Sequence, residues 1–322
     1  MAKGINAMID TKETLQEIAE KNASDIFVIA GHPLTYKAYG ALKKLNEIRL
    51  SEDDTRAFVE SIYRLAENRS TERLLRHGDD DFSFTLEGVS RFRVNAYRQR
   101  GALSAVIRVI RFELPDPNTL GIPEEVMALA EQKRCLILIA GPAASGKSTT
   151  LACLIDKINS EQLKHIITLE DPIEFLHPHK MSIVSQREIV TDTDSYETAM
   201  LSALRQSPDV ILLGAMDDPD VIRLALTAAE SGRLVFAPMH TEGIVQTIMR
   251  LIGSFPADRR AQACSRIANS LTAVVSQTLL SGSAGVSPVS RFDTMLVTDE
   301  IRRMIREDRI ADIAAAHAVV SA

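Results

Sequence analysis

A glycine-rich segment carries the clearest chemical signal in the sequence. It matches the pattern G-x-x-x-x-G-K-[ST] and comprises Gly141, Pro142, Ala143, Ala144, Ser145, Gly146, Lys147, Ser148 and Thr149. The glycines let the backbone curl so that its amide N–H groups face a phosphate, while Lys147 reaches the β- and γ-phosphate oxygens and Ser148 ligates Mg²⁺. An apolar run over residues 136–140 precedes the segment and a helical pattern over 149–159 follows it, which is the context that this motif requires. The segment predicts a site for ATP and Mg²⁺.

A group of carboxylates follows another apolar run. Residues 166–169 lead into the acidic segment EDPIE, residues 170–174. Ligands of open α/β sheets bind at the C-terminal ends of the strands, so these acids are placed to hold Mg²⁺ and to polarise an attacking water. We expect Glu170 or Asp171 to reach the metal through water beside Ser148. The alternative is an ordinary solvated turn, because acids stopped by a proline also favour turns.

A parallel sheet is predicted for the C-terminal part of the chain. Apolar runs alternate there with helical stretches, and the runs cover residues 136–140, 166–169, 210–213 and 234–237. Such alternation is typical of parallel strands with crossover helices. His240 comes just after the last run, beside the expected phosphate site, and an ordinary surface or core histidine is the alternative. The Ser/Gly-rich stretch over 281–290 predicts a surface loop before one last helix.

The N-terminal part follows a different pattern. Ser51 and Asp54 match a capping box, and the apolar residues behind them recur on one face of a helix. Apolar and polar residues then alternate over 82–86 and 92–96, and residues 104–110 predict another strand. We therefore expect a small α+β domain with an antiparallel sheet. Because a proline-rich segment follows it, the expected division is an N-terminal domain over 1–112, a linker over 113–122 and a nucleotide-binding domain over 123–322.

Composition excludes several classes of protein. The chain has 322 residues, of which 45% are hydrophobic and 25% charged, and this length suffices for two domains. A formal net charge of −6 argues against a general nucleic-acid binder, so we expect no nucleic-acid partner. The longest apolar stretch, 135–144, is shorter than the ~20 residues of a membrane span, and the N-terminus has no long apolar signal region. We expect a cytoplasmic protein whose three widely spaced cysteines are buried and reduced.

Long segments of the chain resemble one protein family. ITLEDPIEFLHPHK, SQREIVTDTDSYETAMLSALRQSPDVILLG, IRLALTAAESGRLVF and MHT are similar to type IV pilus retraction ATPases. These are the PilT-type twitching motility proteins of the type II/IV secretion ATPase superfamily. NASDIFVIAGHP and SRFRVNAYRQRGALSAVIRVI resemble the N-terminal domain of that family. EIRRMIRE, residues 300–307, resembles its short helix motif associated with retraction, so the similarity covers residues 10–310.

The resemblance implies a ring-forming, hexameric ATPase. It implies an N-terminal PAS-like domain followed by a RecA-like motor domain that works at the inner face of the cell membrane with an inner-membrane pilus platform protein. Glu170 would position or deprotonate water, and His240 would sense the γ-phosphate. Among the arginines at 91, 93, 98 and 108, we expect Arg98 and Arg108 to reach the nucleotide of a neighbouring subunit as trans fingers. The alternative for these arginines is a solvated basic face.

The departures from the family pattern concern catalysis. The family's Walker B strand ends in glycine followed by a catalytic glutamate, methionine, arginine and aspartate, where this chain has GAMDD, residues 214–218. Ala215 thus stands at the glutamate position, Asp217 stands at the arginine position, and Ala144 replaces a glycine of the phosphate loop. Asp209 begins the strand, about 20 Å from Ala215, and cannot substitute. Losing a general base typically costs 10²–10⁴-fold in rate. Slow or absent hydrolysis with intact ATP binding is therefore an alternative to an active ATPase.

Three functions therefore remain open. The first is an active retraction motor that couples ATP hydrolysis to depolymerisation of pilin. The second is a hydrolysis-impaired paralog that binds nucleotide and acts as a regulatory or mixed-ring subunit of an active paralogous ATPase. The third is another P-loop translocase, acting on nucleic acid or on a secretion substrate, which the acidic balance and the EIRRMIRE helix disfavour.

Overall fold

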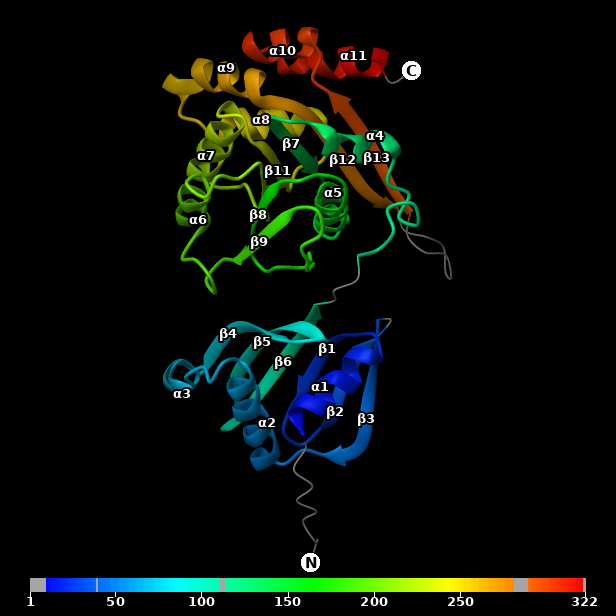
Figure 1. Cartoon of the computed structure of the whole chain (residues 1–322), viewed down its shortest axis with the longest axis vertical. Coiled ribbons are helices and arrows are strands. Elements are labelled where there is room, and N and C mark those ends of the chain that lie inside the picture. Colours follow the sequence, from blue (N-terminus) through cyan, green and yellow to red (C-terminus); the bar gives the residue numbers. More distant parts are fainter. Residues whose placement is uncertain (1–9, 39, 111–113, 281–288, 321–322) are drawn as a thin grey trace, which may run out of the picture. The chain divides into compact units, whose positions relative to one another are not determined.

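The computed structural model describes residues 10–38, 40–110, 114–280 and 289–320 (Figure 1). These residues belong to two compact units, Met1–Phe112 and Glu113–Ala322. Each unit has its own sheet and its own hydrophobic core. No helix within the described ranges is long and apolar enough to cross a membrane.

The N-terminal unit is built on an antiparallel sheet. Its elements are α1 (Thr11–Glu20), β1 (Ala23–Val28), β2 (Pro33–Ala38), β3 (Ala41–Arg49), α2 (Glu52–Leu65), α3 (Glu72–His77), β4 (Asp79–Leu86), β5 (Ser90–Gln99) and β6 (Ala102–Ile110). The strands are ordered β3-β2-β1-β6-β5-β4, and every neighbouring pair is antiparallel. The predicted α+β unit is confirmed.

Helix α2 shows how the local sequence sets this unit. The Ser51 hydroxyl accepts a hydrogen bond from the Asp54 N–H at 3.1 Å, and the Asp54 carboxylate accepts one from the Ser51 N–H at 2.8 Å. This reciprocal pair is the predicted capping box, and it satisfies two backbone donors at the start of the helix. Phe58, Val59 and Ile62 are buried on the face that the apolar spacing predicts.

The C-terminal unit is built on a largely parallel sheet. Its helices and strands are α4 (Glu124–Met127), η1 (Ala128–Glu131), β7 (Cys135–Ala140), α5 (Lys147–Glu161), β8 (His165–Glu170), β9 (Ile183–Glu188), α6 (Tyr196–Ala203), β10 (Val210–Leu213), α7 (Pro219–Glu230), β11 (Leu234–Met239), α8 (Ile244–Gly253), η2 (Ala257–Arg259), α9 (Arg260–Ser270), β12 (Leu271–Leu280), β13 (Val289–Leu296), α10 (Asp299–Arg306) and α11 (Ile310–Val320). The strand order is β13-β12-β7-β11-β10-β8-β9. Among the described strands of this sheet, only the β12–β13 pair is antiparallel, so the predicted parallel sheet is confirmed.

The prediction for the C-terminal region was partly wrong. Residues 289–290 belong to strand β13 and not to a loop, while 281–288 lie outside the described residues. Two helices, α10 and α11, follow β13 where one was expected. Strand β12 begins at Leu271 directly after α9, with no glycine or proline to separate the two. The sequence therefore lacks the usual breaker between helix and strand.

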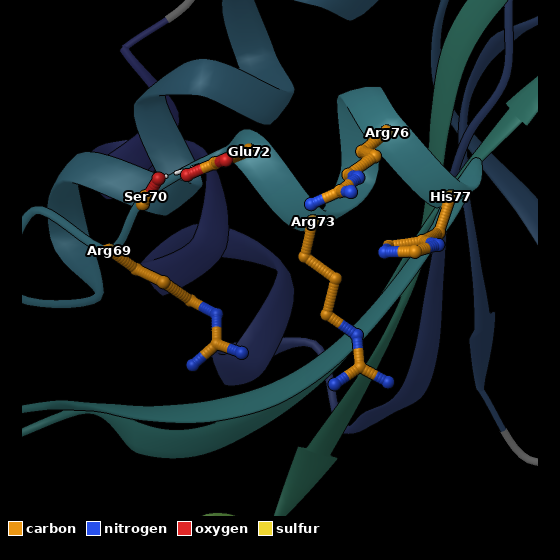
Figure 2. Close-up of a pocket in the computed structure, with 6 residues that line it drawn as sticks. All are labelled: Arg69, Ser70, Glu72, Arg73, Arg76 and His77. Carbon is orange, nitrogen blue, oxygen red and sulfur yellow. Dashed lines mark hydrogen bonds between the residues drawn. The ribbon is translucent and has the colours of Figure 1, made fainter.

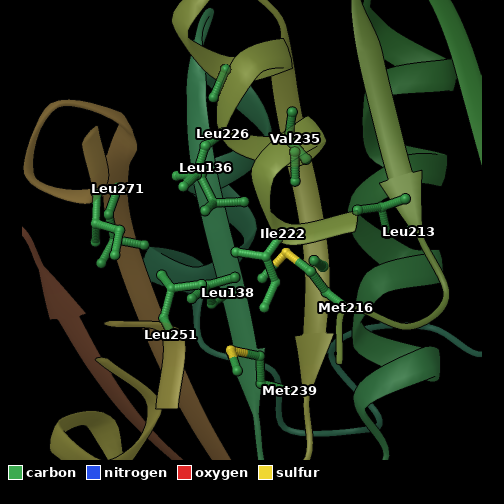
Figure 3. Close-up of a cluster of buried hydrophobic side chains, with 14 of the residues drawn as sticks. Leu136, Leu138, Leu213, Met216, Ile222, Leu226, Val235, Met239, Leu251 and Leu271 are labelled. Carbon is green, nitrogen blue, oxygen red and sulfur yellow. The ribbon is translucent and has the colours of Figure 1, made fainter. Parts of the chain in front are cut away.

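The central strand β7 is buried on both faces of the sheet. Leu136 and Leu138 belong to a core cluster with α7, α8 and α9, part of which is drawn in Figure 3. Ile137 and Ile139 point to the other face, where they pack in a second cluster with α5. A parallel strand covered by helices on both sides has a continuous apolar sequence, as CLILIA does. This packing fixes the strand end from which the phosphate loop emerges.

Truncation of a β7 side chain should measure how much stability this core provides. Leu138 has no exposed surface, so Leu138→Ala should lower the free energy of unfolding by about 2–5 kcal/mol through lost burial and a residual cavity. Leu163, which is 80% exposed, is the matched control, and Leu163→Ala should change it by less than about 0.5 kcal/mol. Urea denaturation followed by circular dichroism measures both. Equal effects of the two substitutions would contradict the assignment of Leu138 to the core.

Candidate functional site

The phosphate loop connects β7 to α5, as its motif requires. Gly141 has φ +156° and Gly146 has φ +90°, which are conformations that favour glycine. A Cβ atom on Gly141 would lie 2.2 Å from the carbonyl oxygen of Gln277, and one on Gly146 would lie 2.8 Å from Gln277 Nε2. Gly141 is therefore required by close packing against the backbone of β12 as well as by its conformation, and Gly146 by its conformation.

Ala144 adopts a left-handed conformation in the middle of this loop. Its φ is +60°, where an L-residue other than glycine is disfavoured by roughly 1–2 kcal/mol. The replacement of the family's glycine by alanine therefore strains the loop. The strain sits two residues before Gly146, within the segment whose amides would face a phosphate.

Lys147 already donates to its own loop. Its Nζ donates hydrogen bonds to the carbonyls of Gly141 at 2.9 Å and Pro142 at 2.8 Å. Burial lowers the pKa of Lys147, and the negative charges of Asp217 and Glu174 partly oppose that shift. The buried hydroxyl of Ser145 has no hydrogen-bond partner among the described residues. A loop with a buried cation and an unsatisfied hydroxyl suits a phosphate group, which would supply acceptors for both.

The acidic segment faces the phosphate loop across a small cavity of about 40 Å³. Ser148, Glu170, Asp171 and Glu174 all contribute to its lining. The Ser148 hydroxyl donates to Glu174 Oε1 at 3.2 Å. The carboxylate in direct contact with Ser148 is that of Glu174, and the expected approach of Glu170 or Asp171 to the metal through water stays a prediction. The structure thus brings the predicted serine and acids together, with a different acid in contact.

Glu170 is the last residue of β8, and two neighbouring polar side chains donate hydrogen bonds to its carboxylate. Its Oε1 accepts hydrogen bonds from the Thr168 hydroxyl at 2.6 Å and from Gln186 Nε2 at 3.3 Å. Burial raises the pKa of Glu170 to about 7, although these two hydrogen bonds act in the opposite direction. A carboxylate with a pKa near neutral pH is suited to accept a proton from water.

The neighbouring strand end lacks a catalytic carboxylate. The Gly214 N–H donates to the Leu169 carbonyl at 2.7 Å, and a Cβ on Gly214 would come within 2.9 Å of Glu170 Cα. Ala215 follows at once, and its side chain carries no carboxylate. Asp209 lies at the far end of β10, where its carboxylate accepts from the His165 N–H.

The two acids that follow Ala215 have different surroundings. Asp218 caps α7, because its carboxylate accepts from the Asp220 N–H at 2.7 Å. Asp217 is exposed, and its charge acts on the pKa of Lys147 and of Tyr196. Asp217 therefore lies within electrostatic range of the phosphate loop.

Comparison with known proteins identifies the family. A family model described as type II/IV secretion system protein matches residues 3–308. The chain is 40% identical over 305 residues to the type IV pilus retractation ATPase PilT of Pseudomonas aeruginosa, with 95% of this chain and 88% of that protein covered. The chain is a PilT-type member of the type II/IV secretion ATPase family. The type IV pilus ATPase PilU of the same organism is 33% identical over 305 residues, with 95% and 79% covered.

Solved structures agree with this assignment to the PilT-type ATPases. The crystal structure of the pilus retraction motor PilT with bound ADP matches with a TM-score of 0.87 at 39% identity, covering 95% of this chain and 88% of that chain. The ATPase DotB of Legionella pneumophila matches with a TM-score of 0.79 at 28% identity, covering 96% and 86%. The predicted fold class, an N-terminal domain followed by a RecA-like domain with a parallel sheet, is confirmed.

His240 lies where the PilT-type pattern expects its histidine. It follows Met239, the last residue of β11, and the Met239 carbonyl accepts a hydrogen bond from the Gly141 N–H at 3.1 Å. The histidine is therefore one residue from a backbone contact with the phosphate loop. Its side chain is exposed, and its role as a phosphate sensor stays a prediction.

The two arginines expected as trans fingers lie on opposite faces of the N-terminal sheet. Arg98 lies on the same face of β5 as the buried residues Phe92 and Val94, and its guanidinium donates to the Leu75 carbonyl at 3.1 Å. Arg108 is paired across the sheet with Arg93 and donates to Asp25 at 3.4 Å. The structure does not bring the two together, and the role of each stays a prediction.

A second cavity, in the N-terminal unit, is lined by cationic side chains. Its volume is about 480 Å³, and its lining includes Arg69, Arg73, Arg76 and His77 (Figure 2). The buried carboxylate of Asp80 accepts two hydrogen bonds from Arg69 and forms an ion pair with Arg73 at 3.5 Å. Arg76 and His77 stand in the last turn of α3, where the helix dipole favours cations. Arg69 and Arg73 therefore compensate the buried charge of Asp80, and we assign the cavity no ligand.

Sequence reasoning missed several polar residues around the phosphate site. Gln277 of β12 packs on both glycines of the loop, and Gln186 of β9 links Glu170 to the backbone of the acidic loop. His177 lines the same cavity as Glu170, and burial lowers its pKa to about 4, so its ring is neutral. The available signal for Gln277 was its long polar side chain shortly after the apolar run AVV, residues 273–275.

The raised pKa of Glu170 predicts a pH-dependent stability. The carboxylate form is disfavoured in the folded state. The contribution of Glu170 to the free energy of unfolding is therefore fully present below its unfolded pKa of 4.5 and is lost as the pH rises through about 7. Glutamine does not ionise, so Glu170→Gln does not lose this stability. The free energy of unfolding of the variant minus that of wild type should therefore be up to about 3 kcal/mol larger at pH 8 than at pH 4.5. Urea unfolding in EDTA without nucleotide measures it, with the exposed Glu242→Gln as control. Parallel pH profiles for wild type and Glu170→Gln would contradict the prediction.

Proposed function

We propose that the protein is an ATP-binding motor of the pilus retraction type that works as a hexameric ring. The observation that carries this proposal is the placement of Ser148, which follows Lys147 at the start of α5, with the carboxylates of the acidic loop around one small cavity. Membership of the PilT-type ATPases supports it. The solved relative that is named a pilus retraction motor has ADP bound.

Nucleotide binding is assigned to the phosphate loop. The amides of residues 141–149 would face the phosphates, and Lys147 would exchange its two loop carbonyls for phosphate oxygens. Ser148 and Glu174 would hold Mg²⁺, with Glu170 or Asp171 acting through water. The metal supplies charge neutralisation at the β- and γ-phosphates.

Hydrolysis is assigned to Glu170 with His240 beside the loop. Glu170 would accept a proton from water as the water oxygen bonds to the γ-phosphorus and the bond to the bridging oxygen breaks. Its pKa of about 7 leaves a large fraction ionised at neutral pH. Arg98 or Arg108 of a neighbouring subunit would stabilise the charge on the transferred phosphoryl group. In this proposal the ring acts at the inner face of the membrane on a pilus platform protein.

Loss of Lys147 tests the nucleotide site directly. Lys147→Ala should weaken the binding of Mg-ADP by at least tenfold, because it removes the cation that pairs with the phosphates. Lys157→Ala is the matched control, since Lys157 lies on the far part of α5 and pairs with Glu161. Isothermal titration calorimetry measures both. Equal affinity of Lys147→Ala and wild type would overturn the assignment.

Ala215 favours a second candidate function. With alanine at the position of the catalytic glutamate, the protein would bind ATP and hydrolyse it slowly. Such a chain would serve as a regulatory or mixed-ring subunit of an active paralogous ATPase. The strained Ala144 in the phosphate loop is a second departure from the family pattern in the same site.

Restoring the acid separates the two candidate functions. Ala215→Glu combined with Asp217→Arg should raise kcat, with the usual 10²–10⁴-fold contribution of a general base as the ceiling. Ala215→Gln with Asp217→Arg is the matched control, because glutamine has the size of glutamate but cannot accept the proton as a carboxylate does. A steady-state phosphate-release assay measures kcat. If wild type already turns over as fast as active relatives, Glu170 alone is a sufficient base. If the glutamate variant shows no gain in kcat, the chain functions in nucleotide binding and regulation.

A further inference from the structure

Gln277 is a long polar side chain buried in β12, where it lies between Ser276 and Thr278. Only 2% of its surface is exposed. Strand β12 runs parallel to β7 with Ser276 opposite Ala140, so Gln277 comes alongside Gly141, the first residue of the phosphate loop. Burying a side-chain amide in a sheet is unfavourable unless its polar atoms form hydrogen bonds.

The amide of Gln277 lies between two parts of the nucleotide site. Its Oε1 accepts a hydrogen bond at 2.8 Å from the hydroxyl of Thr150, which is itself 1% exposed. Its Nε2 lies 2.8 Å from the position that a Cβ on Gly146 would take. Gly146 is the N-cap of α5, and its carbonyl accepts from the Thr150 N–H at 3.0 Å. The amide therefore spans the first turn of α5.

That turn carries the two side chains that the proposed function needs. Lys147 and Ser148 lie between Gly146 and Thr150 in the chain, so whatever fixes these two ends also fixes the direction of the lysine and the hydroxyl.

We propose that Gln277 is a positioning residue of the nucleotide site, which holds the phosphate loop and the first turn of α5 in the geometry that binds phosphate. It acts through Thr150 and through contact with Gly146, not by contact with the nucleotide. This inference rests on the proposed function, because it concerns the same phosphate site. It adds a residue from the opposite end of the domain sequence to that site.

A double-mutant cycle on nucleotide affinity tests the inference. Gln277→Leu and Thr150→Val keep side-chain volume and remove the hydrogen bond from either side. Each should weaken Mg-ADP binding about tenfold, which corresponds to about 1.4 kcal/mol. Because both act through one contact, the double variant should bind no more than about threefold more weakly than the weaker single variant. Thr150→Ser keeps the hydroxyl, and Ser276→Ala alters the neighbouring residue of β12, so both should bind within about twofold of wild type.

Calorimetry gives the affinities, and thermal melting without nucleotide reports folding. Affinities of Gln277→Leu and Thr150→Val within twofold of wild type would overturn the inference, whatever their melting temperatures. If the affinity losses of the two single variants multiply in the double variant, the two residues act independently and not through one contact, which would also overturn the inference. If Gln277→Leu fails to fold, Thr150→Val against Thr150→Ser decides alone. Absence of Mg-ADP binding by wild type would instead overturn the proposed function, and the inference with it.

Discussion

The site depends on backbone hydrogen bonds that extend the parallel sheet beyond the ends of its strands. The Gly141 N–H bonds to the Met239 carbonyl, and the Gly214 N–H bonds to the Leu169 carbonyl. The first bond joins the phosphate loop to the residue before His240. The second joins the Walker B strand end to the residue before Glu170. Groups that are about a hundred residues apart in the first case and about 45 in the second are thereby placed along one edge, as the rule for ligand sites of open α/β sheets requires.

The sequence was sufficient to predict those parts of this sheet edge whose residue types are specific to one structural role. A glycine–lysine–serine loop between an apolar run and a helical pattern is specific for a phosphate site, and Ser51 with Asp54 is similarly specific for a helix start. The four central strands were predictable because β-branched and aliphatic runs between helical stretches are typical of buried parallel strands. The contact of Glu174 with Ser148 was not predictable, because three acids within five residues have equivalent chemistry. Only the path of the loop selects one of them.

The residues that sequence reasoning missed share one physical feature. Gln277, Gln186 and His177 act through contacts formed between distant strands and loops, and no local pattern marks such contacts. Strand β12 was also missed, because it continues from α9 without a glycine or proline. A buried polar residue in an apolar strand is the one signal that pointed to Gln277. It indicates that a partner exists but does not say which residue it is.

The strand that carries Gln277 also leads to the helix that resembles the retraction motif. Strand β12 pairs with β13 over eight residue pairs, and the Val297 N–H returns to the Thr272 carbonyl at 2.8 Å just before α10 begins. Helix α10 is anchored to α9, because Arg302 donates to the Ala268 carbonyl and Arg306 donates to Asn269. A displacement of β12 against β7 would therefore carry α10 with it, since β12 is hydrogen-bonded directly to the segment that enters α10. The Gln277–Thr150 contact thus lies on a strand whose backbone is hydrogen-bonded to the segment that enters α10, which is a direct structural connection between the proposed nucleotide site and that helix.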